Sequence, residues 1–90
     1  MAQEVPLPCG HTITIEGTLK MRELRAWAAA EDRGDWLACY GYLTRFVKEW
    51  DWEGLDPSQP ESYDELEMME YKEINQAISD YIRGEAARKN

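Results

Sequence analysis

Apolar positions recur with a helical period in residues 36–52. Five large side chains follow one another at steps of four, three, four and three residues: Trp36, Tyr40, Leu43, Val47 and Trp50. Residues at these steps share one face of an α-helix. The pattern predicts a central helix over residues 35–50, with the rest of the chain packed against its apolar face.

Ahead of this helix the pattern has a period of two. Ile13 and Ile15 alternate with threonines, which is typical of a half-buried strand. A Pro-Cys-Gly turn stands at positions 8–10, so the sequence predicts a β-hairpin over residues 4–16. Pro6 has no amide hydrogen, which confines the first strand of this hairpin to the edge of a sheet.

A second helical pattern covers residues 19–33, with Thr18 as its predicted N-cap. Trp27 lies beside its apolar stripe, which consists of Met21, Leu24 and Ala28. Gly34 suits the left-handed position after a helix, and Asp35 suits the N-cap of the next one. A connection this short predicts that the two helices fold back on one another.

Residues 51–61 form an acidic linker whose prolines and glycine stop the helical pattern. Ser62 and Glu65 have the spacing of a capping box, which predicts a last helix over residues 62–83. Its stripe is Tyr71, Ile74, Ile78 and Tyr81. Met68 and Met69 fall on opposite sides of that stripe. Either the segment is two short helices with a break near Met68, which we favour, or both methionines are exposed.

These elements define the expected fold. Residues 84–90 are expected to be a frayed tail. Ninety residues hold one core, so residues 1–90 are expected to form a single domain. The predicted class is mainly α, with a short N-terminal β-hairpin followed by a compact three- to four-helix bundle.

The composition of the chain indicates the class of protein and the cellular compartment to which this domain belongs. A hydrophobic share of 43% is too high for a disordered chain. The sequence holds no run of about 18 apolar residues and does not begin like a signal peptide. We therefore expect a cytoplasmic protein. Its two cysteines, Cys9 and Cys39, are expected to be reduced thiols.

Charge is concentrated in one segment. Residues 51–73 hold nine acidic side chains and one base, Lys72, which gives this segment a net charge of −8. Such a surface repels phosphate backbones, so no nucleic-acid partner is expected. A basic protein partner, or simply a role in solubility, is the better match for this charge.

Few residues could bind a metal or act as a catalyst. Cys9 and His11 invite a metal interpretation with Cys39 as third ligand, but a structural zinc site needs a fourth ligand, often in a second close pair. No third group orients a cysteine–histidine nucleophile. We therefore expect no metal, no cofactor and no catalytic residue. One set of carboxylates is interpreted as a solvated acidic rim: Asp64, Glu65, Glu67, Glu70 and Glu73.

The surface candidates are apolar residues beside this rim. We expect a hydrophobic anchor for a partner within an acidic surround, as binding hot spots often are. Its predicted residues are Trp50, Trp52, Leu55, Met68 and Met69. The alternative is that Trp52 and Leu55 only close the end of the helical bundle.

The order of four segments resembles the tail assembly chaperones of long-tailed phages. These segments are LPCGHTITIEG, LKMRELRAW, GDWLACYGYLTRFVKEWDW and SYDELEMMEYKEINQAISDYI. The resemblance covers about residues 4–83 and concerns the layout of the chain. It implies a non-enzymatic protein of the host-cell cytoplasm that keeps the long tape measure protein soluble and recruits tail tube subunits. It carries no contact residues over to this chain.

Two other interpretations stay open at this point. The acidic segment could imitate nucleic acid in a phage-encoded inhibitor, or the chain could be a small structural subunit of a tail or connector. A homo-oligomer is compatible with each of them, because a lone hairpin gains stability by packing on a neighbour.

Overall fold

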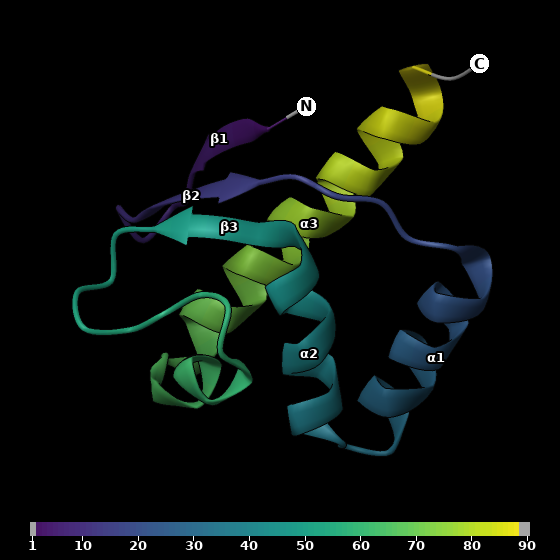
Figure 1. Cartoon of the computed structure of the whole chain (residues 1–90), viewed down its shortest axis with the longest axis horizontal. Helices are drawn as coiled ribbons and strands as arrows, with labels where there is room; N and C mark the ends of the chain where they lie inside the picture. The colour runs from purple at the N-terminus through teal and green to yellow at the C-terminus, as the bar shows by residue number, and fades with distance from the viewer. Residues whose placement is uncertain (1, 89–90) are drawn as a thin grey trace.

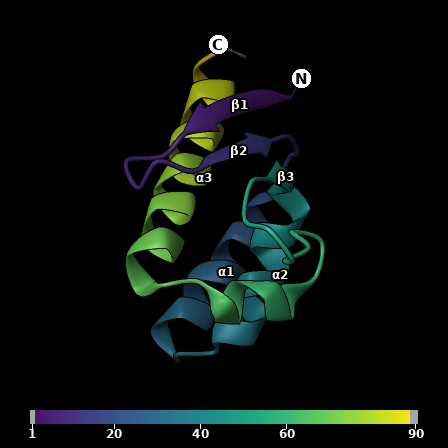
Figure 2. The same ribbon diagram turned by 90° about the vertical axis from the view of Figure 1, so that its left-hand side faces the viewer.

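The computed structural model describes residues 2–88 and folds them around a small antiparallel sheet (Figures 1 and 2). Its elements in chain order are β1 Gln3–Pro6, β2 Thr12–Ile15, α1 Met21–Asp32, α2 Trp36–Phe46, β3 Val47–Trp50, the 3-10 helix η1 Pro60–Glu65, and α3 Met68–Arg88. The predicted mainly helical class with an N-terminal hairpin is confirmed. The sheet, however, has three strands in the order β1-β2-β3.

The hairpin forms as the alternation predicts. β1 pairs antiparallel with β2, and Gly10 takes a positive φ of 100° in the turn between them. The Leu7 N–H donates to the His11 carbonyl at 2.7 Å. Hydrogen-bonded and non-hydrogen-bonded pairs alternate along an antiparallel ladder. Since Leu7 and His11 form a hydrogen-bonded pair, Pro6 stands opposite Thr12 in a non-hydrogen-bonded pair, where β2 requires no donor from it. The predicted edge role of this strand is confirmed, and Pro6 blunts the open edge of β1.

The third strand corrects the predicted central helix. α2 ends at Phe46 instead of Trp50, and Val47–Trp50 becomes β3, antiparallel to β2. The register shifts between Thr14 and Ile15, which marks a bulge in the pairing. A bulge sets two residues of one strand against one of the other. Within β3, Val47 and Trp50 are therefore the inward pair with two exposed residues between them, a spacing that also fits a helix.

The core lies between the sheet, α2 and α3. Its most deeply buried side chains include Ile13, Ile15, Leu43, Phe46, Ile74 and Ile78. α3 packs against both α2 and β2, and Figure 2 shows it running past the sheet. The expected helical bundle is therefore present only in part, since the sheet supplies one wall of the core.

α1 folds back beside α2, but with a different face inward than the sequence pattern predicted. Trp27 and Ala30 are its buried residues, and the Trp27 ring stacks 5.6 Å from that of Tyr42. The predicted stripe of Met21, Leu24 and Ala28 is exposed. The Trp27 ring has more area to bury than any one of these three side chains, and its stacks on Tyr42 and Phe46 accompany the observed orientation of the helix.

The caps around the first two helices are partly as expected. Lys20, not Thr18, is the N-cap of α1, and its N–H donates to the Glu23 carboxylate at 3.0 Å. Gly34 adopts a φ of 70°, and Asp35 accepts from the Ala38 N–H at the start of α2. The predicted glycine stop and aspartate cap are confirmed.

The segment after the linker breaks where expected. η1 ends at Glu65 and α3 begins at Met68, so the favoured break near Met68 is confirmed. The predicted capping box is wrong, because Ser62 and Glu65 both lie inside η1. At the start of α3 the Glu67 N–H instead donates to Glu70 at 2.9 Å.

The last helix is longer than predicted. Its inward stripe is confirmed, with Ile74, Ile78 and Tyr81 buried. α3 continues through Gly84 to Arg88, so the frayed tail expected over residues 84–90 is helical as far as Arg88. Residues 89–90 lie outside the described residues. Within residues 2–88, no helix is both long and apolar enough to cross a membrane.

Candidate functional site

Six large apolar side chains of the described residues are exposed, two on α1 and four in the first turns of α2 and α3. Met21 and Leu24 lie on α1, where their exposed fractions are 69% and 38%. The other four are the first two residues of two helices: Trp36 and Leu37 of α2, and Met68 and Met69 of α3. We call Met21, Leu24 and Ala28 the α1 stripe.

A groove lies between the first turns of α2 and α3 and the 3-10 helix. Its cavity volume is about 390 Å³. The lining is apolar and aromatic except for one lysine, and consists of Trp36, Tyr40, Tyr63, Leu66, Met68, Tyr71 and Lys72. We call this feature the groove. It has the size and lining of a site for side chains of a partner.

Aromatic rings form the walls of the groove. Tyr40 stacks on Tyr63 with ring centroids 5.9 Å apart, and meets Tyr71 edge to face at 5.8 Å. Trp36 meets Tyr71 edge to face at 6.0 Å. Such contacts hold the rings in fixed positions, so the groove is preformed and does not need a ligand to order it.

The phenols of these walls stay uncharged. Burial raises the pKa of Tyr63 and of Tyr71 far above the ordinary range. Burial, and then the hydrogen bond to Asp64, raises the pKa of Tyr40 as well. The Tyr40 hydroxyl donates to Asp64 at 3.0 Å, and that of Tyr63 donates to the Pro57 carbonyl at 2.8 Å. The groove therefore offers a neutral aromatic surface with an acid at its edge.

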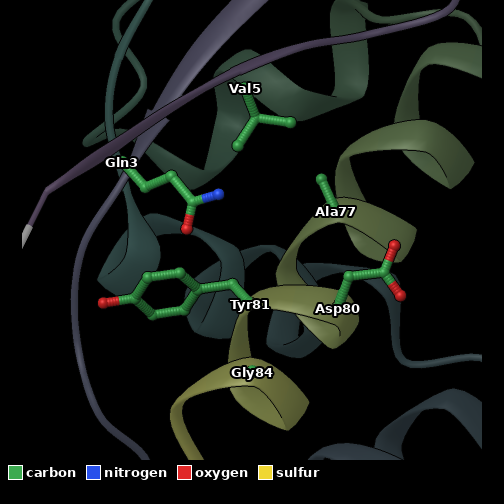
Figure 3. Close-up of a pocket in the computed structure, with 6 residues that line it drawn as sticks. All are labelled: Gln3, Val5, Ala77, Asp80, Tyr81 and Gly84. Atoms are coloured by element: carbon green, nitrogen blue, oxygen red, sulfur yellow. The ribbon is translucent and has the colours of Figure 1, made fainter. Parts of the chain in front are cut away.

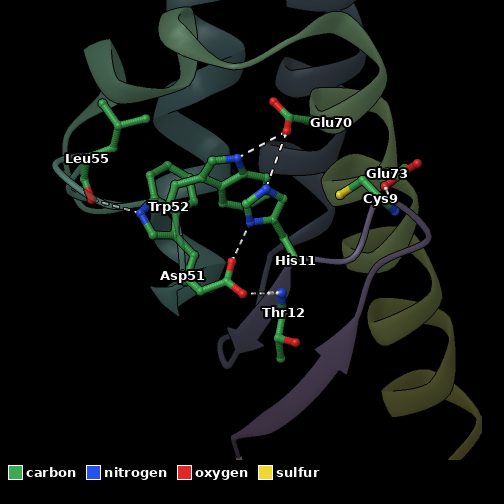
Figure 4. Close-up of polar contacts among 9 residues, drawn as sticks. Cys9, His11, Thr12, Asp51, Trp52, Leu55, Glu70 and Glu73 are labelled. Atoms are coloured by element: carbon green, nitrogen blue, oxygen red, sulfur yellow. Dashed lines mark hydrogen bonds and ion pairs between the residues drawn. The ribbon is translucent and has the colours of Figure 1, made fainter.

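The second aromatic and acidic cluster joins the hairpin turn to α3 (Figure 4). The His11 ring stacks on Trp52 with centroids 3.9 Å apart and an interplanar angle of 16°. Its Nδ1 lies 2.6 Å from Asp51 Oδ1, and its Nε2 lies 3.7 Å from Glu70 Oε2. We call His11, Asp51, Trp52 and Glu70 the His11 clamp.

Trp50 and Trp52, which the sequence predicted at a partner-binding surface, instead make hydrogen bonds within the chain. The Trp52 Nε1–H donates to Glu70 at 3.2 Å, and the Trp50 Nε1–H donates to the Leu55 carbonyl at 2.8 Å. Trp50 also packs on Tyr63, with ring centroids 4.9 Å apart. Trp50, Trp52 and Leu55 are half-buried and lie outside the groove lining, whereas Met68 belongs to it.

The five acids predicted as one rim divide into two groups. Glu70 holds Trp52 and the first turn of α3, Glu73 accepts from the Cys9 N–H at 3.0 Å, and Asp64 accepts from Tyr40. The carboxylates of Glu65 and Glu67 are exposed and make no hydrogen bond or ion pair within residues 2–88. They flank Leu66 of the groove and are free to meet a partner.

Sequence reasoning assigned Trp36 and Tyr40 to the core, and so missed two walls of the groove. Both residues do lie on the apolar face of α2, but the first turn of that helix extends past the buried core. The sequence does carry a signal of this. Asp35 caps the helix immediately before Trp36, and side chains of a first helical turn often lie at the boundary of a core.

The other features of the described residues offer less chemistry. A cavity of about 310 Å³ separates β1 from α3, and Figure 3 shows Val5 and Ala77 facing each other across it. Cys9 is exposed and Cys39 is buried. No group of three or more metal-binding side chains is close enough to hold an ion in the part of the chain that the structure describes.

Comparison with known proteins identifies no relative. The chain matches no protein-family model, no curated protein and no solved structure.

Proposed function

We propose that this protein is a non-enzymatic binding protein that holds an amphipathic helix of a client polypeptide in the groove. The resemblance described above makes the client the tape measure protein of a long-tailed phage, and makes the protein a tail assembly chaperone that also recruits tail tube subunits. Its place of action would be the host-cell cytoplasm.

One observation carries this proposal: a preformed aromatic groove includes the exposed side chains of Trp36 and Met68, and the residues that follow them, Leu37 and Met69, are exposed as well. Soluble monomers seldom expose such clusters without a binding role. Methionine side chains adapt to varied partners, and a helix that lies in an apolar groove presents anchors at helical spacing. The free carboxylates of Glu65 and Glu67 favour lysine or arginine at the border of the client helix.

The nucleic-acid mimic is less well supported. A mimic needs an array of free negative charges, but within the acidic segment Asp51, Asp56 and Glu73 already accept hydrogen bonds from their own chain. A mimic should fail with Glu65→Lys and Glu67→Lys and should weaken steeply with salt. A chaperone should lose its client with Trp36→Ala and tolerate moderate salt.

Co-expression with the tape measure protein tests the proposal. The wild-type chain should raise the soluble fraction of the client and co-purify with it. The double variant Trp36→Ala, Met68→Ser should lose at least about tenfold in affinity, because each anchor contributes on the order of 1 kcal/mol or more. A wild-type protein that leaves the client insoluble would contradict the proposal.

Met21→Ser is the matched control for the client experiment. Met21 and Met68 each begin an α-helix, and their exposed fractions are 69% and 72%. Only Met68 lines the groove. Measured with dilute protein, Met21→Ser should bind the client as tightly as the wild type does. An equal loss in both variants would place the client site elsewhere.

A further inference from the structure

We infer that the α1 stripe of one molecule binds the groove of a second copy, so that the protein associates head to tail. This inference does not depend on the identity of the client. It assigns a partner to the exposed α1 stripe, which the proposed function leaves unused, and gives the groove a second occupant.

The two surfaces are matched in polarity. The α1 stripe presents exposed apolar side chains at positions 21, 24 and 28, the spacing of one helix face, and two of them, Leu24 and Ala28, also line a small cavity of about 80 Å³ between α1 and α3. The groove is concave and apolar, and two of its lining residues, Trp36 and Met68, are themselves exposed. An exposed apolar helix face is what a helix-binding groove accepts.

The charges around the first two turns of the α1 stripe are basic, whereas Glu31, beyond Ala28, is an acid that accepts a hydrogen bond from Asn75 of α3. Lys20, Arg22 and Arg25 are exposed in or next to its first two turns. Arg25 borders the stripe on one side and Lys20 on the other, at about 100° per residue. Glu23, the acid among these bases, is paired with Arg45 of α2. The exposed charge at this end of α1 is therefore positive.

The charges around the groove are acidic. Asp64, Glu65 and Glu67 flank it on the side of the 3-10 helix, and Lys72 is the only base in the lining. The two helix N-termini beside it are already capped by their own acids, Asp35 for α2 and Glu70 for α3. One backbone N–H at each of these termini therefore already has a carboxylate acceptor. A helix face bordered by lysine and arginine is thus the complementary partner.

The two surfaces cannot meet within one chain. Figure 1 shows α1 on one side of α2, and the 3-10 helix with the first turn of α3 on the other side. Pairing therefore joins different molecules, and each copy keeps one free stripe and one free groove. Such a heterologous contact builds rings or open chains, not a closed two-fold dimer. A client helix competes for the groove, so client binding should dissolve the assembly.

Two complementary variants test this arrangement. Met21→Glu, Leu24→Glu spoils the stripe and leaves the groove intact. Trp36→Glu, Met68→Glu spoils the groove and leaves the stripe intact. All four side chains are exposed, and circular dichroism and thermal unfolding of each variant verify that the fold persists. Sedimentation velocity then follows the association state of full-length protein from about 10 µM to about 1 mM, the range suited to a small interface.

Head-to-tail pairing makes a distinctive pattern of results. The wild type should form species larger than dimers as concentration rises, and each variant alone should stay monomeric. An equimolar mixture should form a 1:1 dimer and stop there, because only one intact stripe and one intact groove remain. A monomeric wild type at 1 mM, or a mixture that stays monomeric, would overturn the inference. So would a variant that dimerises alone, since that requires a symmetric contact.

A charge exchange gives an independent readout. The double variant Lys20→Glu, Arg25→Glu and the double variant Glu65→Lys, Glu67→Lys should each fail to associate when present alone at low salt. Mixing the two should restore it, because each altered surface then faces its opposite charge. No recovery in the mixture would show that the charges do not face one another. Failure of client binding in the co-expression experiment would leave all of these results unchanged, so the two proposals are tested separately.

Discussion

The groove and the His11 clamp are built from the same kinds of residue. They differ in whether the polar groups and aromatic rings of these residues find partners within the chain. Each combines tryptophan or tyrosine rings with carboxylates of the acidic segment. In the clamp, the Trp52 Nε1–H, the His11 ring and the Glu70 carboxylate all find partners within the chain. At the groove, Trp36 stays 52% exposed, and the carboxylates of Glu65 and Glu67 have no partner among the described residues.

This contrast separates stability from binding. A tryptophan that stacks on a neighbour and donates a hydrogen bond contributes to the free energy of unfolding. A tryptophan half out of the core contributes less to folding, and its remaining exposed area is available to a partner. The aromatic and acidic residues of segment 36–73 therefore fall into two groups. Those with contacts inside the chain stabilise the fold, and those without such contacts leave surface available to a partner.

The largest expected difference is between the two tryptophans. Trp52→Ala should lower the free energy of unfolding by about 2–4 kcal/mol, because it removes the stack on His11 and the bond to Glu70. Trp36→Ala should cost about 1 kcal/mol or less. Urea unfolding followed by circular dichroism measures both. Equal losses would show that Trp36 is part of the core after all.

The sequence predicts the hairpin and α3 well because their patterns are complete. Ile13 and Ile15 alternate strictly within β2, and Ile74 and Ile78 keep a helical step. Each of these segments fits only one period, two residues for the strand or 3.6 residues for the helix, so the sequence pattern identifies the buried residues correctly. Both elements were therefore assigned from residues that the structure buries.

The third strand was missed because its pattern is ambiguous. β3 has four residues and a bulge opposite it, so Val47 and Trp50 stand three apart and continue the helical step from Leu43. Only pairing with β2, a contact distant in sequence, makes this segment a strand. The orientation of α1 was missed for a related reason. Its two faces are both apolar enough to pack, and Trp27 meets Tyr42 and Phe46 only once α2 is in place.

The residues of the proposed binding groove were only partly predictable. Met68 was expected at the surface and lines the groove, whereas Trp50, Trp52 and Leu55 are held by internal hydrogen bonds. Composition shows that a segment is aromatic and acidic. It does not show which indole N–H finds an acceptor, because those acceptors come from the linker and from α3.

A smaller difference is expected between two acids of the predicted rim. Glu70→Ala should lower the free energy of unfolding by about 1–2 kcal/mol, because the Glu67 N–H and the Trp52 Nε1–H lose their acceptor. Glu65→Ala, its matched control, removes the same charge and should change stability by no more than about 0.5 kcal/mol. Chemical denaturation compares the two. A cost for Glu65→Ala equal to that for Glu70→Ala would mean that net charge, not the contact, is responsible.

The smallest expected effect is a pH dependence in the clamp. The hydrogen bond to His11, followed by that from the Thr12 N–H, lowers the pKa of Asp51 below its ordinary value. A lowered carboxyl pKa stabilises the fold above about pH 4, the unfolded value, and this contribution is lost as pH falls through the folded pKa. Asp51→Asn should therefore be less stable than the wild type at pH 7, and the two should converge toward about pH 2.

Thermal unfolding of both proteins from about pH 7 to about pH 2 measures this convergence. Glu53→Gln removes one charge from the same loop without breaking a hydrogen bond among the described residues, so it measures the effect of charge alone. A gap between Asp51→Asn and the wild type that stays constant over the whole range would contradict the linkage. In that case the Asp51–His11 contact would act as a neutral hydrogen bond, and the clamp would owe its strength to the stack of His11 on Trp52.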